Sequence, residues 1–280
     1  ITPPGSILFG LFVNEHKGGT ASTAQLGDLE KHIGRHASLS LHFRGFTTSF
    51  PGEDEADDLA NGRTPIESWN CGDSNANVAA GRDDEIIKRR ADALKAYGHP
   101  IFVRYMWEMN LPTHDNHRAA CYDASTDLPK SRFSPQQFVA AWNHIHQIFV
   151  NEGAANVIWF WCPSGRTNPM AYYPGSASVD WVGFDAYDRH GGPFADTYRD
   201  AYGWMAGLGK PIMIGETAAQ AQSQTAFFES AARTLQSDFP LVKGFVYFDA
   251  PGNVGGWNVS DVSAFAKMVN DPYFAGKLQP

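Results

Sequence analysis

The stretch FVRYMWEMN, residues 102–110, reads as a buried β-strand that contains an arginine and ends on a glutamate. Ionised side chains are costly to remove from water unless an opposite charge compensates them. A period of two along the strand would place Arg104 and Glu108 on one face. We therefore expect Arg104 to point into the fold and to pair there with Glu216 or Asp185. A purely structural ion pair is the alternative interpretation of Arg104.

This strand is one of a series. Short apolar or β-branched runs alternate with amphipathic helical segments along the chain, and this alternation indicates βα units around a parallel sheet. No glycine-rich phosphate motif follows the first run, which argues against a dinucleotide-binding fold. Eight runs predict a (β/α)8 TIM barrel that forms one catalytic domain over residues 1–280. The predicted strands are 7–13, 38–43, 65–69, 101–106, 156–161, 180–187, 211–216 and 241–248.

Two helices have readable ends. Asp83 is expected to cap a helix that stops at Gly98. Ser134, followed by Pro135, is expected to begin a second helix. Only the fifth helical segment, NPMAYYPGSAS at 168–178, carries a weak helical signal.

Composition restricts the class of partner. The net charge is -8 without a Lys/Arg-rich run, which argues against nucleic acid and against an anionic membrane surface. The chain holds 8 Trp, 10 Tyr and 19 Phe, which suggests a surface that stacks on a flat, neutral ligand. We expect a monomer that acts on a polysaccharide or oligosaccharide. We also expect a secreted or extracellular protein whose signal peptide is absent from this sequence, because residue 1 is isoleucine.

Two carboxylates end predicted strands. Glu108 follows the fourth strand and Glu216 ends the seventh, so both should face the mouth of a barrel, where barrel enzymes carry their chemistry. A retaining glycosidase needs an acid/base and a nucleophile about 5–5.5 Å apart, whereas an inverting enzyme needs about 6.5–9.5 Å. Beside Arg104, Glu216 should stay ionised as the nucleophile, while Glu108 between Trp107 and Met109 should hold a proton. A solvated loop carboxylate is the alternative interpretation of either glutamate alone.

Four stretches together resemble glycoside hydrolase family 26, a (β/α)8 family of retaining endo-glycanases of which most members cleave β-mannan. They are VRYMWEMN (103–110), MAYYPGSASVDWVGFDAYD (170–188), PIMIGET (211–217) and FVYFDAPGNVGGW (245–257). The resemblance implies that Glu108 is the acid/base and that Arg104 is the arginine four residues before it. It also implies that Glu216 is the nucleophile, that Tyr187 reaches toward Glu216 and that Asp185 lies on the same face of the sixth strand.

The sequence departs from the family pattern around both glutamates. Trp107 replaces the histidine that precedes the family's acid/base, and GETAA (215–219) replaces the usual surroundings of the nucleophile. β-1,4-Mannan is therefore the first expected substrate, with mixed-linkage β-glucan or xylan as alternatives. A hydrolase of another family in the same clan and a non-catalytic carbohydrate-binding barrel also remain open.

The remaining site expectations concern aromatic rings, cysteines and metals. Trp161 and Trp257 are the preferred sugar-stacking rings among five aromatic residues near predicted strand ends, the others being Trp69, Tyr172 and Tyr173. Cys71, Cys121 and Cys162 lack CxxC spacing, so either one disulfide, with Cys71–Cys121 as the candidate, or three free thiols are expected. His114, Asp115 and His117 are interpreted as a solvated loop, and we expect no metal and no cofactor.

Overall fold

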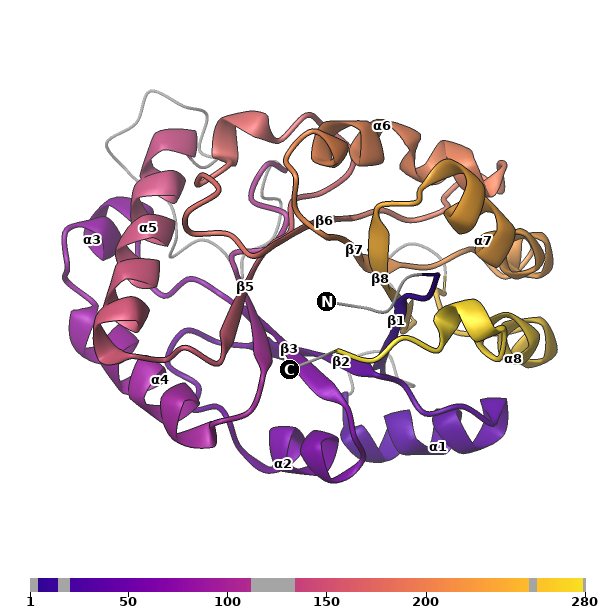
Figure 1. Cartoon of the computed structure of the whole chain (residues 1–280), viewed down its shortest axis with the longest axis horizontal. Helices are drawn as coiled ribbons and strands as arrows, with labels where there is room; N and C mark the ends of the chain where they lie inside the picture. Colours follow the sequence, from indigo (N-terminus) through magenta and orange to yellow (C-terminus); the bar gives the residue numbers. More distant parts are fainter. Residues whose placement is uncertain (1–4, 15–20, 112–133, 252–255, 279–280) are drawn as a thin grey trace.

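The computed structural model describes residues 5–14, 21–111, 134–251 and 256–278. Eight parallel strands form a closed barrel in chain order, which confirms the predicted (β/α)8 fold. In Figure 1 the strands make an inner ring and the helices surround it. The strands are β1 (Leu8–Val13), β2 (Leu39–Arg44), β3 (Thr64–Trp69), β4 (Ile101–Tyr105), β5 (Val157–Trp161), β6 (Trp181–Asp185), β7 (Ile212–Thr217) and β8 (Val242–Asp249).

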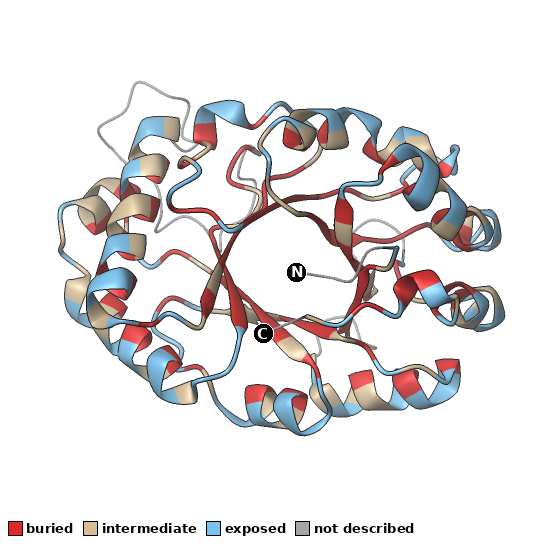
Figure 2. Cartoon of the chain, viewed as in Figure 1, coloured by how far each residue is buried: buried red, intermediate tan, exposed pale blue. Residues whose placement is uncertain are grey.

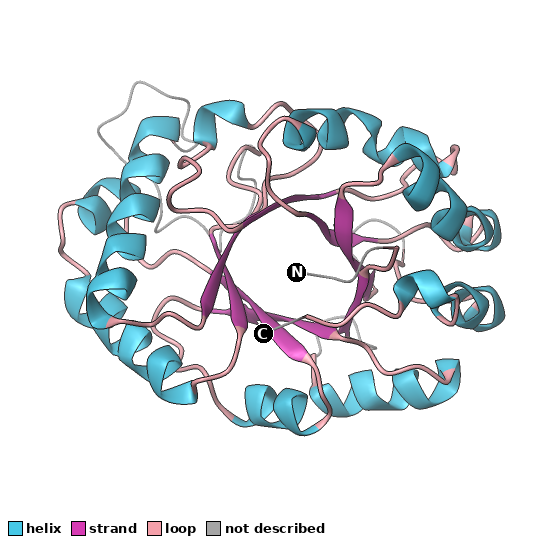
Figure 3. Cartoon of the chain, in the orientation of Figure 1, coloured by secondary structure: helices cyan, strands magenta, loops and turns pink. Residues whose placement is uncertain are grey.

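The helices lie outside the barrel, as the secondary-structure colouring of Figure 3 shows. The predicted weak fifth helix is a single 3₁₀ turn, η2 (Met170–Tyr172), and a second 3₁₀ turn, η3 (Pro272–Phe274), follows the last helix. None of the described helices is long and apolar enough to span a membrane. The α-helices are α1 (Thr23–Ile33), α2 (Glu53–Ala60), α3 (Asn75–Ala79), α4 (Asp84–Tyr97), α5 (Pro135–Glu152), α6 (Phe194–Ala206), α7 (Gln224–Asp238) and α8 (Val262–Val269).

The predicted helix ends follow local sequence. Ser134 caps α5 by accepting a hydrogen bond from the Gln137 N–H, with Pro135 in the first turn. Asp83 occupies the cap position of α4 but makes no side-chain capping bond, and Gly98 ends that helix in the left-handed conformation that glycine adopts freely.

The period of two along each strand separates an inner from an outer core. On β1, Leu8 and Phe12 point into the barrel, whereas Phe9 and Leu11 pack against the helices. Figure 2 shows the strands almost entirely buried, and the helices buried on the side that faces them. The side of each strand that a residue occupies therefore decides whether it can reach the barrel interior.

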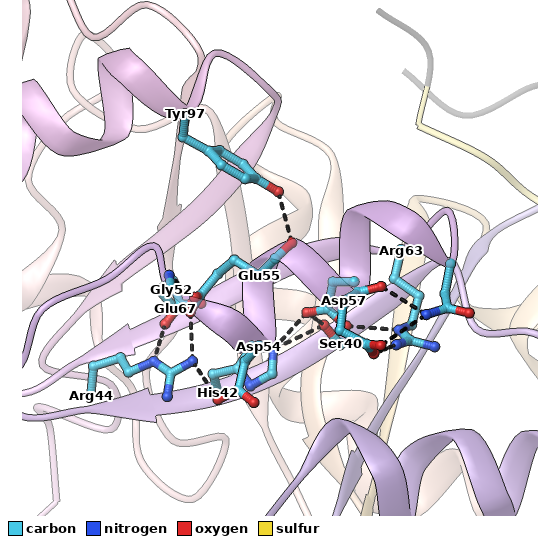
Figure 4. Close-up of polar contacts among 12 residues, drawn as sticks. Ser40, His42, Arg44, Gly52, Asp54, Glu55, Asp57, Arg63, Glu67 and Tyr97 are labelled. Atoms are coloured by element: carbon cyan, nitrogen blue, oxygen red, sulfur yellow. Dashed lines mark hydrogen bonds and ion pairs between the residues drawn. The ribbon is translucent and has the colours of Figure 1, made fainter.

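One part of the outer layer is charged rather than apolar. Ser40, His42 and Arg44 alternate with the inward residues of β2, and Glu67 lies beside His42 on β3. These side chains meet the acidic helix α2, as Figure 4 shows. Arg44 Nη2 contacts Glu55 at 2.5 Å and Arg44 Nε contacts Glu67 at 3.1 Å. Buried charge of this kind persists because each ionised group has a partner.

Candidate active site

Arg104 is the centre of the polar interior. It lies on the inner face of β4, is fully buried, and forms an ion pair with Glu216 through Nη2. Its Nη1 donates to both carboxylate oxygens of Asp185 at 3.1 Å, and its Nε donates to Ser68 Oγ at 2.6 Å. Burial alone would lower the pKa of Arg104, but the charges of Asp185 and Glu216 raise it above its ordinary value. The expected pairing of the inward arginine is confirmed for both candidate carboxylates.

Glu216 is aimed into the barrel by irregular strand pairing. The register of β7 shifts against β8 between Ile214 and Thr217, and a second shift occurs against β6. A bulge of this kind turns a side chain away from the face that the period of two assigns to it. The neighbouring Thr217 faces the helices, where its hydroxyl lies 2.6 Å from that of Tyr198. Glu216 thus reaches Arg104 although its neighbour points outward.

Tyr187 holds the other oxygen of Glu216. Its hydroxyl donates a hydrogen bond of 2.6 Å to Glu216 Oε2, while Oε1 faces Arg104. Burial, followed by the charges of Glu216, Asp185 and Glu108, raises the pKa of Tyr187 well above its usual value, so the phenol stays a donor. Both oxygens of Glu216 are therefore held by hydrogen-bond donors.

Asp185 is the second buried carboxylate that pairs with Arg104. Burial, reinforced by the charge of Glu216 and opposed by that of Arg104, raises its pKa well above the usual range. The hydrogen bond from the Cys162 thiol to Asp185 Oδ1 also opposes this rise.

Glu108 lies in a turn and not on the strand. β4 ends at Tyr105, and Met106 and Glu108 both adopt positive φ, at 48° and 54°. The expectation that Glu108 shares a strand face with Arg104 is wrong, because the period of two ends before it. The Glu108 N–H donates to the carbonyl of Cys162, which follows β5, at 3.0 Å.

The turn nevertheless directs Glu108 toward Asp185 and Tyr187. Glu108 is partly exposed and lines a cavity of about 410 Å³ together with Asp185 and Tyr187. Its charge acts on the same two residues as that of Glu216. Both glutamates thus face one region at the carboxyl ends of the strands.

Asn110 fixes the end of this turn. Its amide nitrogen donates to the carbonyls of Ser164 and Thr167 at 2.9 Å, and its oxygen accepts from the Ser164 N–H at 2.8 Å. These bonds tie the turn after β4 to the loop after β5. Neither this role of Asn110 nor the Ser68 contact of Arg104 was anticipated from the sequence.

The tryptophans expected to stack on sugar are mostly covered by protein. Trp161 and Trp69 are fully buried, since the period of two turns both toward the helices. Trp257 is 5 % exposed, with its ring 5.1 Å from that of Tyr187 and the Arg189 guanidinium 5.5 Å from its centre. Burial argues against the expected stacking role of Trp161 and Trp257. Tyr172 is also buried, and Tyr173 is partly exposed.

A different set of rings borders the mouth, and we call it the aromatic arc. Phe12 on β1 stacks on Phe248 of β8 with centroids 4.5 Å apart, and Phe43 on β2 contacts Phe12 at 5.2 Å. Trp107 lies 4.9 Å from Phe43, which places it in the arc. Phe43, Trp107 and Phe248 remain partly exposed. These phenylalanines were not predicted as sugar-stacking rings, although each lies inward near the end of its strand.

Two of the three cysteines lie within the described residues. Cys71 is disulfide-bonded and Cys162 is a buried free thiol. Cys121, the predicted partner of Cys71, and the histidines at 114 and 117 lie outside the described residues, as does Asp115. Within the described ranges, no group of three or more His, Cys, Asp or Glu side chains could hold a metal ion.

Known proteins share part of this sequence. Endoglucanase H of Acetivibrio thermocellus is 24% identical over 262 residues, covering 87% of this chain and 28% of that protein. Mannan endo-1,4-beta-mannosidase A and B of Caldalkalibacillus mannanilyticus is 28% identical over 129 residues, 44% of this chain and 24% of that protein. The chain therefore spans only about a quarter of the length of these two relatives.

Solved structures share the fold. The Bacillus subtilis mannanase man26 superposes with a TM-score of 0.68 at 17% identity, covering 96% of this chain and 86% of that one. The family profile described as glycosyl hydrolase family 26 matches residues 85–275, which is more than half of the chain and includes Arg104, Glu108, Asp185, Tyr187 and Glu216. The chain belongs to glycosyl hydrolase family 26.

Proposed function

We propose that the protein is a retaining glycoside hydrolase that cleaves internal β-linkages of a neutral polysaccharide through two glutamates. Glu216 is the nucleophile and Glu108 the acid/base. The observation that carries this assignment is the fixation of both Glu216 oxygens by Arg104 and Tyr187, beside a cavity that Glu108 lines. The two carboxylates differ in surroundings, since Glu216 is 5 % exposed and held by two donors, whereas Glu108 is partly exposed at the cavity.

The proposed reaction proceeds in two displacements. Glu216 attacks the anomeric carbon and forms a glycosyl ester, while Glu108 gives its proton to the leaving oxygen. Glu108 then removes a proton from water, which hydrolyses the ester and regenerates both groups. Arg104 and Tyr187 hold the nucleophile in one orientation, so little reorganisation is needed when the ester forms.

The substrate class follows from the rim of the site. The aromatic arc offers partly exposed rings on which the apolar C–H faces of neutral sugars can stack. β-1,4-Mannan is the first candidate, because a mannosidase is among the relatives. Mixed-linkage β-glucan or xylan is the second, because an endoglucanase matches over more of the chain.

Substitution of each glutamate tests the mechanism. Glu108→Gln and Glu216→Gln should each lower kcat by several decades while the unfolding midpoint stays near that of the wild type. Glu229→Gln, on the exposed face of α7, is the matched control and should leave kcat unchanged. Proton NMR of the first product should show retention of the β-anomer. Wild-type turnover in either site variant, or inversion at the anomeric carbon, contradicts the assignment.

A polysaccharide panel tests the substrate. We expect reducing-sugar release from β-mannan, β-glucan or xylan, with oligomers as early products if cleavage is internal. Binding to a polysaccharide without any product would favour a carbohydrate-binding barrel instead. Export of the protein is part of the same proposal, because a polymer is degraded outside the cell and Cys71 is disulfide-bonded. A monomeric state is a second part of it. Cell fractionation and light scattering check these two points.

A further inference from the structure

Cys162 contacts both halves of the candidate active site. It follows β5 directly and shares the inward face of that strand with Phe160. Its carbonyl accepts the hydrogen bond from the Glu108 N–H at 3.0 Å. Its thiol donates to Asp185 Oδ1 at 3.1 Å and accepts from Arg104 Nη1 at 3.5 Å. One residue thus bonds the turn that carries Glu108 and the ion cluster that holds Glu216.

The space around the thiol is closely filled. Cys162 is 1 % exposed, and Gly215, the neighbour of Glu216 on β7, packs directly against it. A Cβ atom added at Gly215 would lie 2.6 Å from the sulfur and 2.8 Å from Asp185 Oδ1, closer than real Cβ atoms come. Glycine at position 215 therefore allows the contact between the thiol and Asp185. The thiol also keeps its proton, because burial and the charge of Asp185 raise its pKa.

We propose that Cys162 is a positioning residue whose thiol, bound to Asp185 and Arg104, holds the guanidinium in the orientation in which it binds Glu216. This inference rests on the proposed two-glutamate mechanism. Arg104 is shared between Asp185 and Glu216, so the thiol donor on Asp185 influences how the guanidinium is divided between them. The charged groups that face the thiol are Arg104 from β4, Asp185 from β6 and Glu216 from β7.

Loss of the thiol should weaken the nucleophile. A donor to the ionised form of Asp185 favours that form, so loss of the thiol raises the pKa of Asp185 further. A more neutral Asp185 leaves more of the Arg104 guanidinium to Glu216. A carboxylate bound more tightly by its cation attacks more slowly, so kcat should fall.

The test uses three variants. Cys162→Ala removes the donor and should lower kcat on the order of tenfold, with KM within about threefold, since one hydrogen bond to a charged group is lost. Cys162→Ser restores a donor and should recover most of the lost kcat. Val182→Ala is the matched control, because Val182 is equally buried but lies on the outer face of β6, and its kcat should equal that of the wild type.

An infrared measurement detects the hydrogen bond between the Cys162 thiol and Asp185 and does not depend on enzyme activity. The S–H stretching band that disappears in Cys162→Ala belongs to this thiol, and a hydrogen bond to Asp185 should place it below the frequency of a free thiol. Asp185→Asn should move the band back toward that frequency. A band at the free-thiol position in the wild type overturns the inference, even if a variant fails to fold.

The results for the glutamine and cysteine variants distinguish the role of Cys162 from the two-glutamate mechanism. Loss of turnover in Glu108→Gln and Glu216→Gln, together with an unchanged kcat in Cys162→Ala, removes the role of Cys162 and leaves the mechanism standing. A serine variant as slow as the alanine variant also overturns it, since volume and not the donor would then matter. Full turnover in either glutamine variant removes the mechanism itself, and with it the positioning role.

Discussion

Arg104 on β4 forms an ion pair with Glu216 on β7, three strands further around the barrel. The arginine side chain is fully buried and the glutamate side chain is 6% exposed, so the pair lies almost wholly inside the protein. Ser68 and Asp185 bind the same guanidinium from β3 and β6. Side chains from three other strands thus hold the proposed nucleophile, directly or through Arg104, and a change at any of them should alter catalysis as well as stability.

Loss of the arginine should affect both properties. Arg104→Met leaves Asp185 and Glu216 buried without a cation, and breaking a buried pair in this way costs about 3–5 kcal/mol of unfolding free energy. The variant that still folds should lose turnover on the order of 100-fold or more, because the nucleophile is no longer held. Denaturant unfolding and kcat/KM on the best polysaccharide measure the two effects.

A second buried arginine provides the control for this substitution. Arg63 contacts Glu30 at 3.0 Å and Asp58 at 2.7 Å, at the start of β3 and away from the mouth. Arg63→Met should destabilise the protein by a similar amount and leave kcat/KM of the folded fraction intact. Equal losses of activity in both arginine variants would show that destabilisation alone explains the result for Arg104.

Removal of the Tyr187 hydroxyl should slow turnover. Tyr187→Phe deletes the 2.6 Å hydrogen bond that holds Glu216 Oε2. Because one oxygen of the nucleophile is then no longer fixed, kcat should fall about 10- to 100-fold while KM changes less. Tyr202→Phe, on α6, is the control and should keep the wild-type kcat. An unchanged kcat in Tyr187→Phe would contradict a role of this hydroxyl in holding the nucleophile.

The charged layer between β2, β3 and α2 should make stability depend on pH (Figure 4). Complete burial, opposed by His42 and reinforced by Glu55, raises the pKa of Glu67 to about 8, whereas its ordinary value is 4.5. The folded protein then binds a proton more tightly than the unfolded chain between these pH values. Stability from this group is present below the unfolded pKa of 4.5 and is lost as pH rises toward about 8.

Glu67→Gln should flatten this alkaline loss. Denaturant midpoints at about pH 5 and about pH 9 should differ less in the variant than in the wild type, because glutamine does not ionise. Glu55 acts at the other end of the scale: despite its burial, hydrogen bonds from Glu67 and Gly52 hold its pKa at about 2, so its contribution is lost only on strong acidification. Glu85→Gln, whose side chain is exposed, is the control and should run parallel to the wild type. A parallel curve for Glu67→Gln would exclude its titration as the cause.

The barrel and its central ion pair could be predicted because both follow from regular periodicity. Each of the eight predicted runs overlaps one of the eight strands, with ends that differ by at most two residues, since apolar runs in a parallel barrel are buried on both faces. The inward direction of Arg104 follows from its alternation with the outward Val103 and Tyr105. The period of two also assigns Trp161 to the outer face and Cys162 to the inner one. This signal contradicts the predicted role of Trp161 as a stacking ring.

Departures from periodicity could not be predicted. Glu108 reaches the site through a turn in which two non-glycine residues have positive φ. The sequence alone does not predict this conformation. The bulge that turns Glu216 inward depends on the pairing of β7 with both neighbours. The contacts of Asn110 with the loop after β5 depend on tertiary structure in the same way. These irregularities lie at the mouth of the barrel, where function overrides local preference.

The aromatic arc should contribute to substrate affinity. Phe248→Leu keeps an apolar side chain but removes the flat ring that stacks on Phe12, so KM should rise about 5- to 10-fold, corresponding to about 1 kcal/mol of lost stacking, with a smaller change in kcat. Phe245→Leu is the matched control, because Phe245 lies on the outer face of the same strand against Phe274, and it should lower the unfolding midpoint without changing KM. An unchanged KM in Phe248→Leu together with a raised KM in Trp161→Phe would return the stacking role to Trp161.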